Sequence, residues 1–199
     1  MSGRRERVRV ANRIRIFDVA RDIVAAEGAS ALTIRRVAAE IDYTAPVVYQ
    51  HYADKAALLD AVMVDAYQRL AASLRDSQTL TRSGDPMTLV EAYLGFAESN
   101  RKIFQFMHGM GGVDIAPQRR LEAAADVVEV TGETIVRWRA GQPRALVAME
   151  IRDQAELLWA AATGLASVAF LVPDGFLRAR ALTVPALEPL LMSWVENES

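Results

Sequence analysis

The sequence contains no cysteine, which excludes disulfides, thiol catalysis and zinc or iron–sulfur sites with cysteine ligands. It has only two histidines, His51 and His108, which lie far apart and outside any HExxH pattern, so we expect no metal-dependent enzyme. Glycine and proline are also scarce, with 11 and 7 among 199 residues, which excludes collagen-like chains and the glycine- and proline-rich disordered class. A chain without cysteine fits the reducing cytoplasm best.

No hydrophobic stretch is long enough to span a membrane. The longest stretch without charge is residues 157–173, about 17 residues, whereas a bilayer requires ~20. The N-terminal segment carries charges and has no apolar core before Asp18, so it lacks the composition of a secretory signal. We therefore expect a cytoplasmic protein without a membrane partner, in which residues 157–173 lie in a buried helix.

Apolar residues recur at helical spacing along almost the whole chain, and no segment alternates apolar and polar residues as a strand does. The expected fold class is therefore all-α. The expected helices cover residues 10–27, 33–41, 45–52, 54–70, 87–100, 102–110, 118–140, 144–172 and 184–197, with a surface loop at 76–86. The pattern of the first helix predicts an apolar stripe of Val10, Ile14, Phe17 and Val24, with Ile16, Ala20 and Ile23 beside it.

The net charge of −2 hides an uneven distribution. Residues 1–55 contain ten Lys and Arg against seven Asp and Glu, whereas residues 56–199 contain 13 against 18. The first 15 residues alone hold Arg4, Arg5, Arg7, Arg9, Arg13 and Arg15. This density is expected of an arm that meets a polyanion, and a solvated, frayed terminus is the alternative.

Two short helices, 33–41 and 45–52, are joined by a turn of about three to four residues, which matches the dimensions of a helix-turn-helix. The residues in and around them carry a stronger signal: Leu32, Thr33, Ile34, Arg35, Val37, Ala38, Tyr43, Thr44, Val48, Tyr49, Gln50, His51, Tyr52, Asp54, Lys55, Leu58 and Leu59. This pattern resembles, without gaps over about residues 12–62, the N-terminal domain of the TetR family of bacterial transcriptional repressors. The resemblance implies a three-helix DNA-binding domain, assigned to residues 1–55, and a C-terminal helical domain, assigned to residues 56–199, that binds an effector and dimerises.

Several side chains of this segment suit DNA phosphates. Thr33 and Thr44 place hydroxyls at helix N-termini, where exposed N–H groups and the helix dipole favour an anion. Tyr49, His51 and Lys55 offer a phenol, an imidazole and an ammonium group to the DNA backbone. The resemblance implies that Thr33, Tyr49, His51 and Lys55 hold phosphates.

Base reading is expected from the front of the third helix. The candidates there are Thr44, Ala45, Val47 and Gln50. Arg35 reaches from the preceding helix and suits guanine, while Gln50 suits an adenine edge and Val47 a thymine methyl group. For Arg35, which lies beside Arg36, simple solvation is the alternative.

The chain departs from the family pattern at three positions in this segment. Asp42 replaces the glycine common in the turn, Tyr43 stands where a smaller aliphatic residue is usual, and Ala57 stands where the family often has Glu. Because Asp tolerates the left-handed conformation better than most residues, we expect the turn to survive.

The resemblance weakens after residue 75. Residues 93–97 with 103–107, and residues 158–165, are similar to one TetR C-terminal class that usually has His where this chain has Thr163. The 144–172 helix is apolar on more than one face, so it needs cover on two sides. With the last helix it is expected to build a four-helix bundle across a two-fold axis, which makes the chain a homodimer; an ordinary monomer core is the alternative.

An effector cavity is expected around soft and aromatic side chains, which suit adaptable apolar sites. The candidates are Phe104, Phe106, Met107, Met110, Trp138 and Trp159. Core packing explains each of them nearly as well. His108 is expected to be a surface or hydrogen-bonded histidine rather than a ligand contact.

We interpret the chain as a DNA-binding transcriptional regulator, a repressor that binds a pseudo-palindromic operator as a homodimer and is released by a small, mostly apolar effector. The sequence predicts no enzyme, cofactor or metal, because the glycines at 109, 111 and 112 follow no strand and lack dinucleotide spacing. Glu150 and Asp153 fit an exposed helix face better than a catalytic pair. The alternative is a helical adaptor that uses its basic N-terminal part on another acidic partner.

Overall fold

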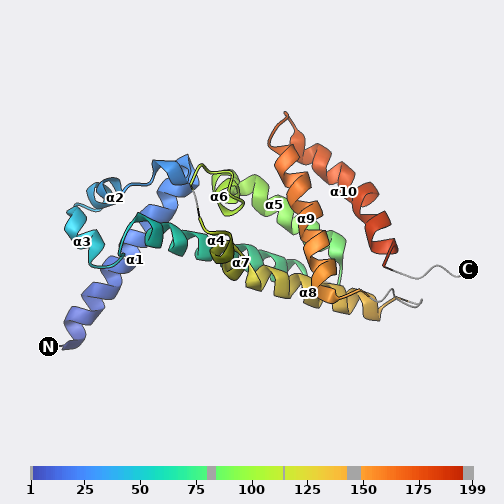
Figure 1. Cartoon of the computed structure of the whole chain (residues 1–199), viewed down its shortest axis with the longest axis horizontal. Helices are drawn as coiled ribbons and strands as arrows, with labels where there is room; N and C mark the ends of the chain where they lie inside the picture. The colour runs from blue at the N-terminus through green and yellow to red at the C-terminus, as the bar shows by residue number, and fades with distance from the viewer. Residues whose placement is uncertain (1, 80–83, 114, 143–148, 195–199) are drawn as a thin grey trace, which may run out of the picture. The chain divides into compact units, whose positions relative to one another are not determined.

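The structure is a computed structural model, and it describes residues 2–79, 84–113, 115–142 and 149–194. These described residues form ten α-helices and one short 3₁₀ helix, with no strand among them, which confirms the all-α class (Figure 1). None of the helices in these ranges combines the length and the apolar character that crossing a bilayer requires.

The chain divides into two compact units. Unit 1 comprises Met1–Tyr67 and Asn100–Ala123, and unit 2 comprises Gln68–Ser99 and Ala124–Ser199. The long helix α4, Lys55–Ser77, supplies residues to both units. Unit 1 thus contains all of residues 1–55 together with 56–67 and 100–123, and the functional boundary expected at residue 55 stays a prediction.

The first helix of unit 1, α1, runs from Ser2 to Glu27. It ends as expected at Gly28, whose φ of 94° is poorly accessible to other residues and whose N–H bonds Val24 O at 2.9 Å. The buried stripe consists of Ile16, Ala20, Ile23 and Val24.

The stripe predicted for α1 was therefore partly wrong. Val10 and Ile14 are about half exposed, and Phe17 is only partly buried. The reason is that Val10 and Ile14 lie about a third of a turn around α1 from Ile16 and Ala20, which form the face that packs into unit 1. Apolar spacing alone does not say which face of a helix is covered.

The next elements form the helix-turn-helix. The 3₁₀ helix Ala29–Ala31 leads into α2, Ile34–Glu40, and α3, Ala45–Tyr49. Thr33 caps α2 by accepting the N–H of Arg36 at 3.2 Å, whereas Thr44 makes no side-chain capping bond to α3. Asp42 adopts a φ of 58° in the turn, so the left-handed conformation expected there is confirmed.

Three further pieces complete unit 1: the start of α4, then α6 at Arg101–Met107 and α7 at Pro117–Ala123. Asp54 caps α4 through a 2.7 Å bond from Ala57 N to its Oδ1. α6 packs against α1, and its buried residues are Ile103, Phe104, Phe106 and Met107.

Unit 2 contains α5, Pro86–Ser99, α8, Ala125–Ala140, α9, Ile151–Ala169, and α10, Gly175–Met192, with α9 packed against each of the other three. The single helix expected at 118–140 is two helices, α7 and α8, broken at Ala124. The helix expected at 144–172 begins at Ile151 and ends at Ala169, while residues 143–148 lie outside the described residues.

The start of the last helix was predicted wrongly, at residue 184 instead of Gly175. Pro185 and Pro189 lie inside α10, where proline normally breaks a helix because it has no N–H to donate. Both prolines are exposed, as is Ala181, so water can hydrogen-bond the carbonyls at 181 and 185 that lose their helical partners.

The turn between α9 and α10 depends on close backbone contact. Asp174 adopts a φ of 53°, and the next residue, Gly175, approaches the end of α9. A Cβ atom at position 175 would lie 2.0 Å from the carbonyl oxygen of Ala169, so only glycine fits without a backbone shift.

We predict that Gly175→Ala lowers the free energy of unfolding by about 2 kcal/mol or more, because the added methyl group forces the turn apart. The matched control is Gly95→Ala inside α5, where a Cβ meets no atom within 4 Å. The control is expected to raise stability by ~0.5–1 kcal/mol through helix propensity. Urea unfolding of both variants at one protein concentration measures the difference, and equal stabilities would contradict the predicted clash.

Candidate nucleic-acid interface

All nine residues predicted to contact DNA lie at least partly at the surface of unit 1. Thr33, Arg35, Thr44, Tyr49 and Gln50 are exposed, and Ala45, Val47, His51 and Lys55 are partly buried. They come from α2 and its N-cap, from α3 with the residues directly before and after it, and from the start of α4. The structure therefore brings these elements together around α3.

Helix α3 is held from one side. Val48 and Tyr52 are buried in the core of unit 1. Thr44 is exposed and Val47 and His51 are only partly buried, so another face of this segment is accessible. Burial of one face fixes the helix and leaves the other for contact with a ligand.

The two arginines of α2 have different roles. The N–H groups on both terminal nitrogens of Arg36 donate to the Glu27 carboxylate, at 2.8 and 2.5 Å. This pairing raises the pKa of Arg36 and lowers the pKa of Glu27. This bidentate pair joins α2 to the end of α1. Arg35 is exposed, so its planar guanidinium group is accessible to a base edge. The guanidinium group of Arg36 is instead paired with Glu27.

Positive charge from α1 lies beside the end of α3. The Arg13 guanidinium group stands 5.3 Å above the ring of Tyr52, and that of Arg15 stands 5.8 Å above the ring of Tyr43. Burial, followed by the nearby charges of Arg9 and Arg13, lowers the pKa of His51, which favours the neutral form of its imidazole.

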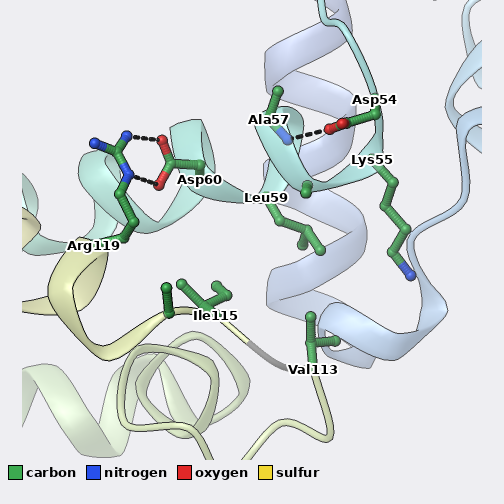
Figure 2. A pocket seen from close by; sticks show the side chains of 10 residues that line it. Asp54, Lys55, Ala57, Leu59, Asp60, Val113, Ile115 and Arg119 are labelled. Atoms are coloured by element: carbon green, nitrogen blue, oxygen red, sulfur yellow. Dashed lines mark hydrogen bonds and ion pairs between the residues drawn. The ribbon is translucent and has the colours of Figure 1, made fainter.

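Lys55 lies at the edge of a cavity of about 540 Å³ (Figure 2). The cavity is formed by the start of α4 and the segment leading into α7, and its lining includes Leu59, Val113 and Ile115. Arg119 closes one side through a bidentate ion pair with Asp60, with N–O distances of 2.5 and 3.3 Å. This pair connects α7 with α4 within unit 1.

The predicted effector residues do not gather at this cavity. Phe104, Phe106 and Met107 are core residues of unit 1, and Met110 is half exposed. Trp138 and Trp159 belong to unit 2, where Trp138 packs edge-on against Trp194 at 6.3 Å. None of the six lines this cavity or a smaller one of about 240 Å³ in unit 2, and their role as ligand contacts stays a prediction.

Sequence reasoning missed a polar cluster inside unit 2. The Nε1 of Trp159 donates to the Tyr93 hydroxyl at 3.1 Å, and this hydroxyl lies 2.7 Å from Oγ1 of Thr163. Trp159 and Thr163 are four residues apart on α9, so they present side chains to the same point on α5. The only available signal was Thr163 in the position where the similar class has His.

A second polar side chain, Gln154, is fully buried in the same unit. Its Oε1 accepts from Nη1 of Arg139 at 3.3 Å. Among the described residues, its Nε2 has no hydrogen-bond partner. A buried amide donor left without a partner is energetically unfavourable.

His108 is hydrogen-bonded as expected. Its Nδ1 lies 2.9 Å from Phe104 O, and its ring stacks on that of Phe104 with centroids 4.2 Å apart. Burial lowers the pKa of His108. No group of three or more His, Asp or Glu side chains within the described ranges is arranged to hold a metal ion.

The helix-turn-helix matches a known protein family. Residues 16–62 match the family model described as bacterial regulatory proteins, tetR family. The match is confined to the helix-turn-helix part of the chain. The match covers the second part of α1, all of α2 and α3, and the start of α4, which are the elements that carry the candidate interface.

Solved structures share the fold over nearly the whole chain. A TetR-family regulator from Pectobacterium atrosepticum has a TM-score of 0.71 at 20% identity, covering 96% of this chain and 97% of its own. SmeT, the repressor of the Stenotrophomonas maltophilia multidrug efflux pump SmeDEF, has a TM-score of 0.66 at 20% identity, covering 93% and 91%. A protein of unknown function from Rhodococcus sp. RHA1 has a TM-score of 0.74 at 21% identity, covering 92% and 95%. A comparison with curated proteins finds no match.

The family match assigns a DNA-binding element to this part of the chain. Residues 16–62 carry a helix-turn-helix of the type found in bacterial regulatory proteins of the tetR family. The low identity to the solved structures means that they establish the fold of unit 2 but not its ligand.

We predict that Tyr93→Phe lowers the free energy of unfolding by about 1–2 kcal/mol, because it removes the hydroxyl that joins Trp159 and Thr163. The matched control is Tyr49→Phe, since the Tyr49 side chain is 52% exposed and its hydroxyl loss should change stability by less than ~0.5 kcal/mol. Urea denaturation measures both variants. If Tyr93→Phe is as stable as the control, the cluster contributes nothing to the core.

Proposed function

We propose that the chain is a repressor that binds a pseudo-palindromic operator as a homodimer and is released by a small, mostly apolar effector. The observation that carries this proposal is the surface around α3, where side chains suited to phosphates and to base edges surround one short helix. SmeT, which has a similar fold, is itself a repressor.

Within this proposal, the interface residues divide by chemistry. Thr33, Tyr49, His51 and Lys55 position the protein on the phosphates, because their hydroxyl, imidazole and ammonium groups suit anionic oxygens. Thr44, Ala45, Val47 and Gln50 contact bases from α3. Arg35 reads a base from α2, since its guanidinium group is exposed beside α3.

The exposed apolar residues of unit 2 support a homodimer. Val168, Leu171 and Leu177 are 62%, 78% and 72% exposed near the turn between α9 and α10. The groove of about 240 Å³ beside them is lined by Arg178 and otherwise by apolar and small residues, including Gly164 and Ala179, which allow close approach of another helix. A second copy that presents its own α9 and α10 covers this surface symmetrically and places two α3 helices on one operator.

The proposed effector site lies in the interior of unit 2. In this proposal Trp159 supplies apolar contact from α9, and an acceptor oxygen on the effector pairs with the buried Nε2 of Gln154. The effector acts by binding a conformation with low operator affinity more tightly than the DNA-bound one. The coupling is reciprocal, so operator DNA weakens effector binding by the same factor.

We predict that Arg35→Ala changes which operator variants are preferred, with losses of ~1–3 kcal/mol confined to particular base substitutions. Duplexes selected from a random library with the unmodified protein supply the operator, and fluorescence anisotropy on single-base variants measures the preference.

Arg36→Ala is the matched control, because it removes the same charge from a side chain engaged with Glu27. The control should retain the base preference of the unmodified protein. Failure to select any duplex would overturn the proposed DNA function, and uniform losses on every variant would refute base reading by Arg35.

We predict that Val168→Glu converts the dimer to a 21.9 kDa monomer, because it places a carboxylate in the apolar surface of α9. Sedimentation at micromolar concentration measures the mass. Leu121→Glu in α7 is the control, since Leu121 is 59% exposed in unit 1 and should leave the dimer intact. A monomeric unmodified protein would show that the proposed dimer is wrong.

A further inference from the structure

The first turns of α1 form a charged helical extension, residues 2–15, which we call the arm. Arg4, Arg5, Arg7, Arg9, Arg13 and Arg15 are all exposed on it. Glu6 is its single acidic residue and lies 4.0 Å from Arg9. Figure 1 shows these turns continuing past α3 at the N-terminal end of the chain. The frayed terminus considered from the sequence is instead a regular helix.

The arginines of the arm lie on two different faces. Arg5, Arg9 and Arg13 repeat every four residues and are in line with Ile16 and Ala20, which pack into unit 1 further along the same helix. This basic stripe therefore faces the side of α1 on which the helix-turn-helix lies. Arg4 and Arg7 lie on the opposite side of the helix.

Contacts within unit 1 agree with this assignment. Arg13 stands over Tyr52, which is two residues beyond the candidate base-reading residue Gln50. Arg9 and Arg13 are close enough to His51 for their charges to lower the pKa of its imidazole. The basic stripe is thus continuous with the surface that holds Tyr49 and His51.

Without a bound anion, the three arginines of the stripe lie close enough to repel each other. Like charges four residues apart on a helix repel each other, and Glu6 pairs with only one of the three. The stripe spans about 12 Å along the helix axis, which suits a row of phosphates rather than a single anion. Because the arm is already helical, little conformational entropy is lost when it binds.

We infer that Arg5, Arg9 and Arg13 bind phosphates of duplex DNA flanking the base pairs that α3 contacts, so that each subunit holds more DNA than its helix-turn-helix alone. This inference rests on the proposed DNA-binding function and deepens it. The partner is duplex DNA rather than another polyanion, because the stripe is continuous with the α3 surface.

The experiment compares two double variants of the full-length protein. Arg5→Ala with Arg9→Ala removes two charges from the stripe, and Arg4→Ala with Arg7→Ala removes two charges from the opposite face. Arg13 is left in place because it packs on Tyr52. Circular dichroism establishes that both variants keep their helical content.

Binding to the selected operator with ten extra base pairs on each side is measured by anisotropy over a range of KCl concentrations. The stripe variant should bind at least tenfold more weakly, and the slope of log K against log salt should fall by about two for each subunit. The opposite-face variant should change affinity by less than threefold. Trimming the flanking base pairs should abolish the difference between the two variants.

Two outcomes overturn the inference while the proposed function stands. If the unmodified protein binds the operator and the stripe variant keeps its affinity and salt slope, the arm does not touch DNA. If both variants lose affinity equally, the arm attracts DNA by its total charge and the stripe has no defined contacts. If the unmodified protein binds no duplex at all, the proposed function itself fails and the inference fails with it.

Discussion

The position of α3 is the constraint on which the candidate interface depends. A helix of five residues makes too few internal hydrogen bonds to be stable alone, so its orientation comes from tertiary packing. Burial of Val48 and Tyr52 provides that packing, and the left-handed turn at Asp42 sets the direction in which α3 leaves α2. The bidentate pair between Arg36 and Glu27 joins α2 to α1 on the other side. The nine candidate residues thus depend on a small number of contacts for their common orientation.

The helix-turn-helix was predictable from the sequence because its signals are local. The cap at Thr33, the terminator at Gly28 and the turn residue Asp42 each act within a few positions of the chain. The predictions that failed needed knowledge of what covers a helix. The periodicity of Val10 and Ile14 is real, but those residues lie on a face of α1 that is about half exposed. In the same way, Pro185 is tolerated in α10 because its surroundings are exposed, which the sequence does not reveal.

The interior of unit 2 was less accessible to prediction. Tyr93 and Thr163 are 70 positions apart in the chain, and neither belongs to a motif that specifies the other. Their contact arises only when α5 packs against α9. The same holds for Gln154, whose burial follows from the packing of α8 against α9 rather than from its own polarity. Polar groups buried by long-range packing carry the ligand chemistry in the proposed function, so the effector is the least predictable part of this protein.

Helix α1 is continuous from Ser2 to Glu27, so a rotation at one end of the helix displaces the other end. Its 26 residues span about 39 Å at the standard rise, with the arm at one end and Gly28 at the other. A rotation of about 5° around the Gly28 end displaces the tip by about 3 Å, close to the 3.4 Å separation of neighbouring base pairs. Since α6 packs against α1, the DNA contact inferred for the arm would be sensitive to a small adjustment where these two helices meet.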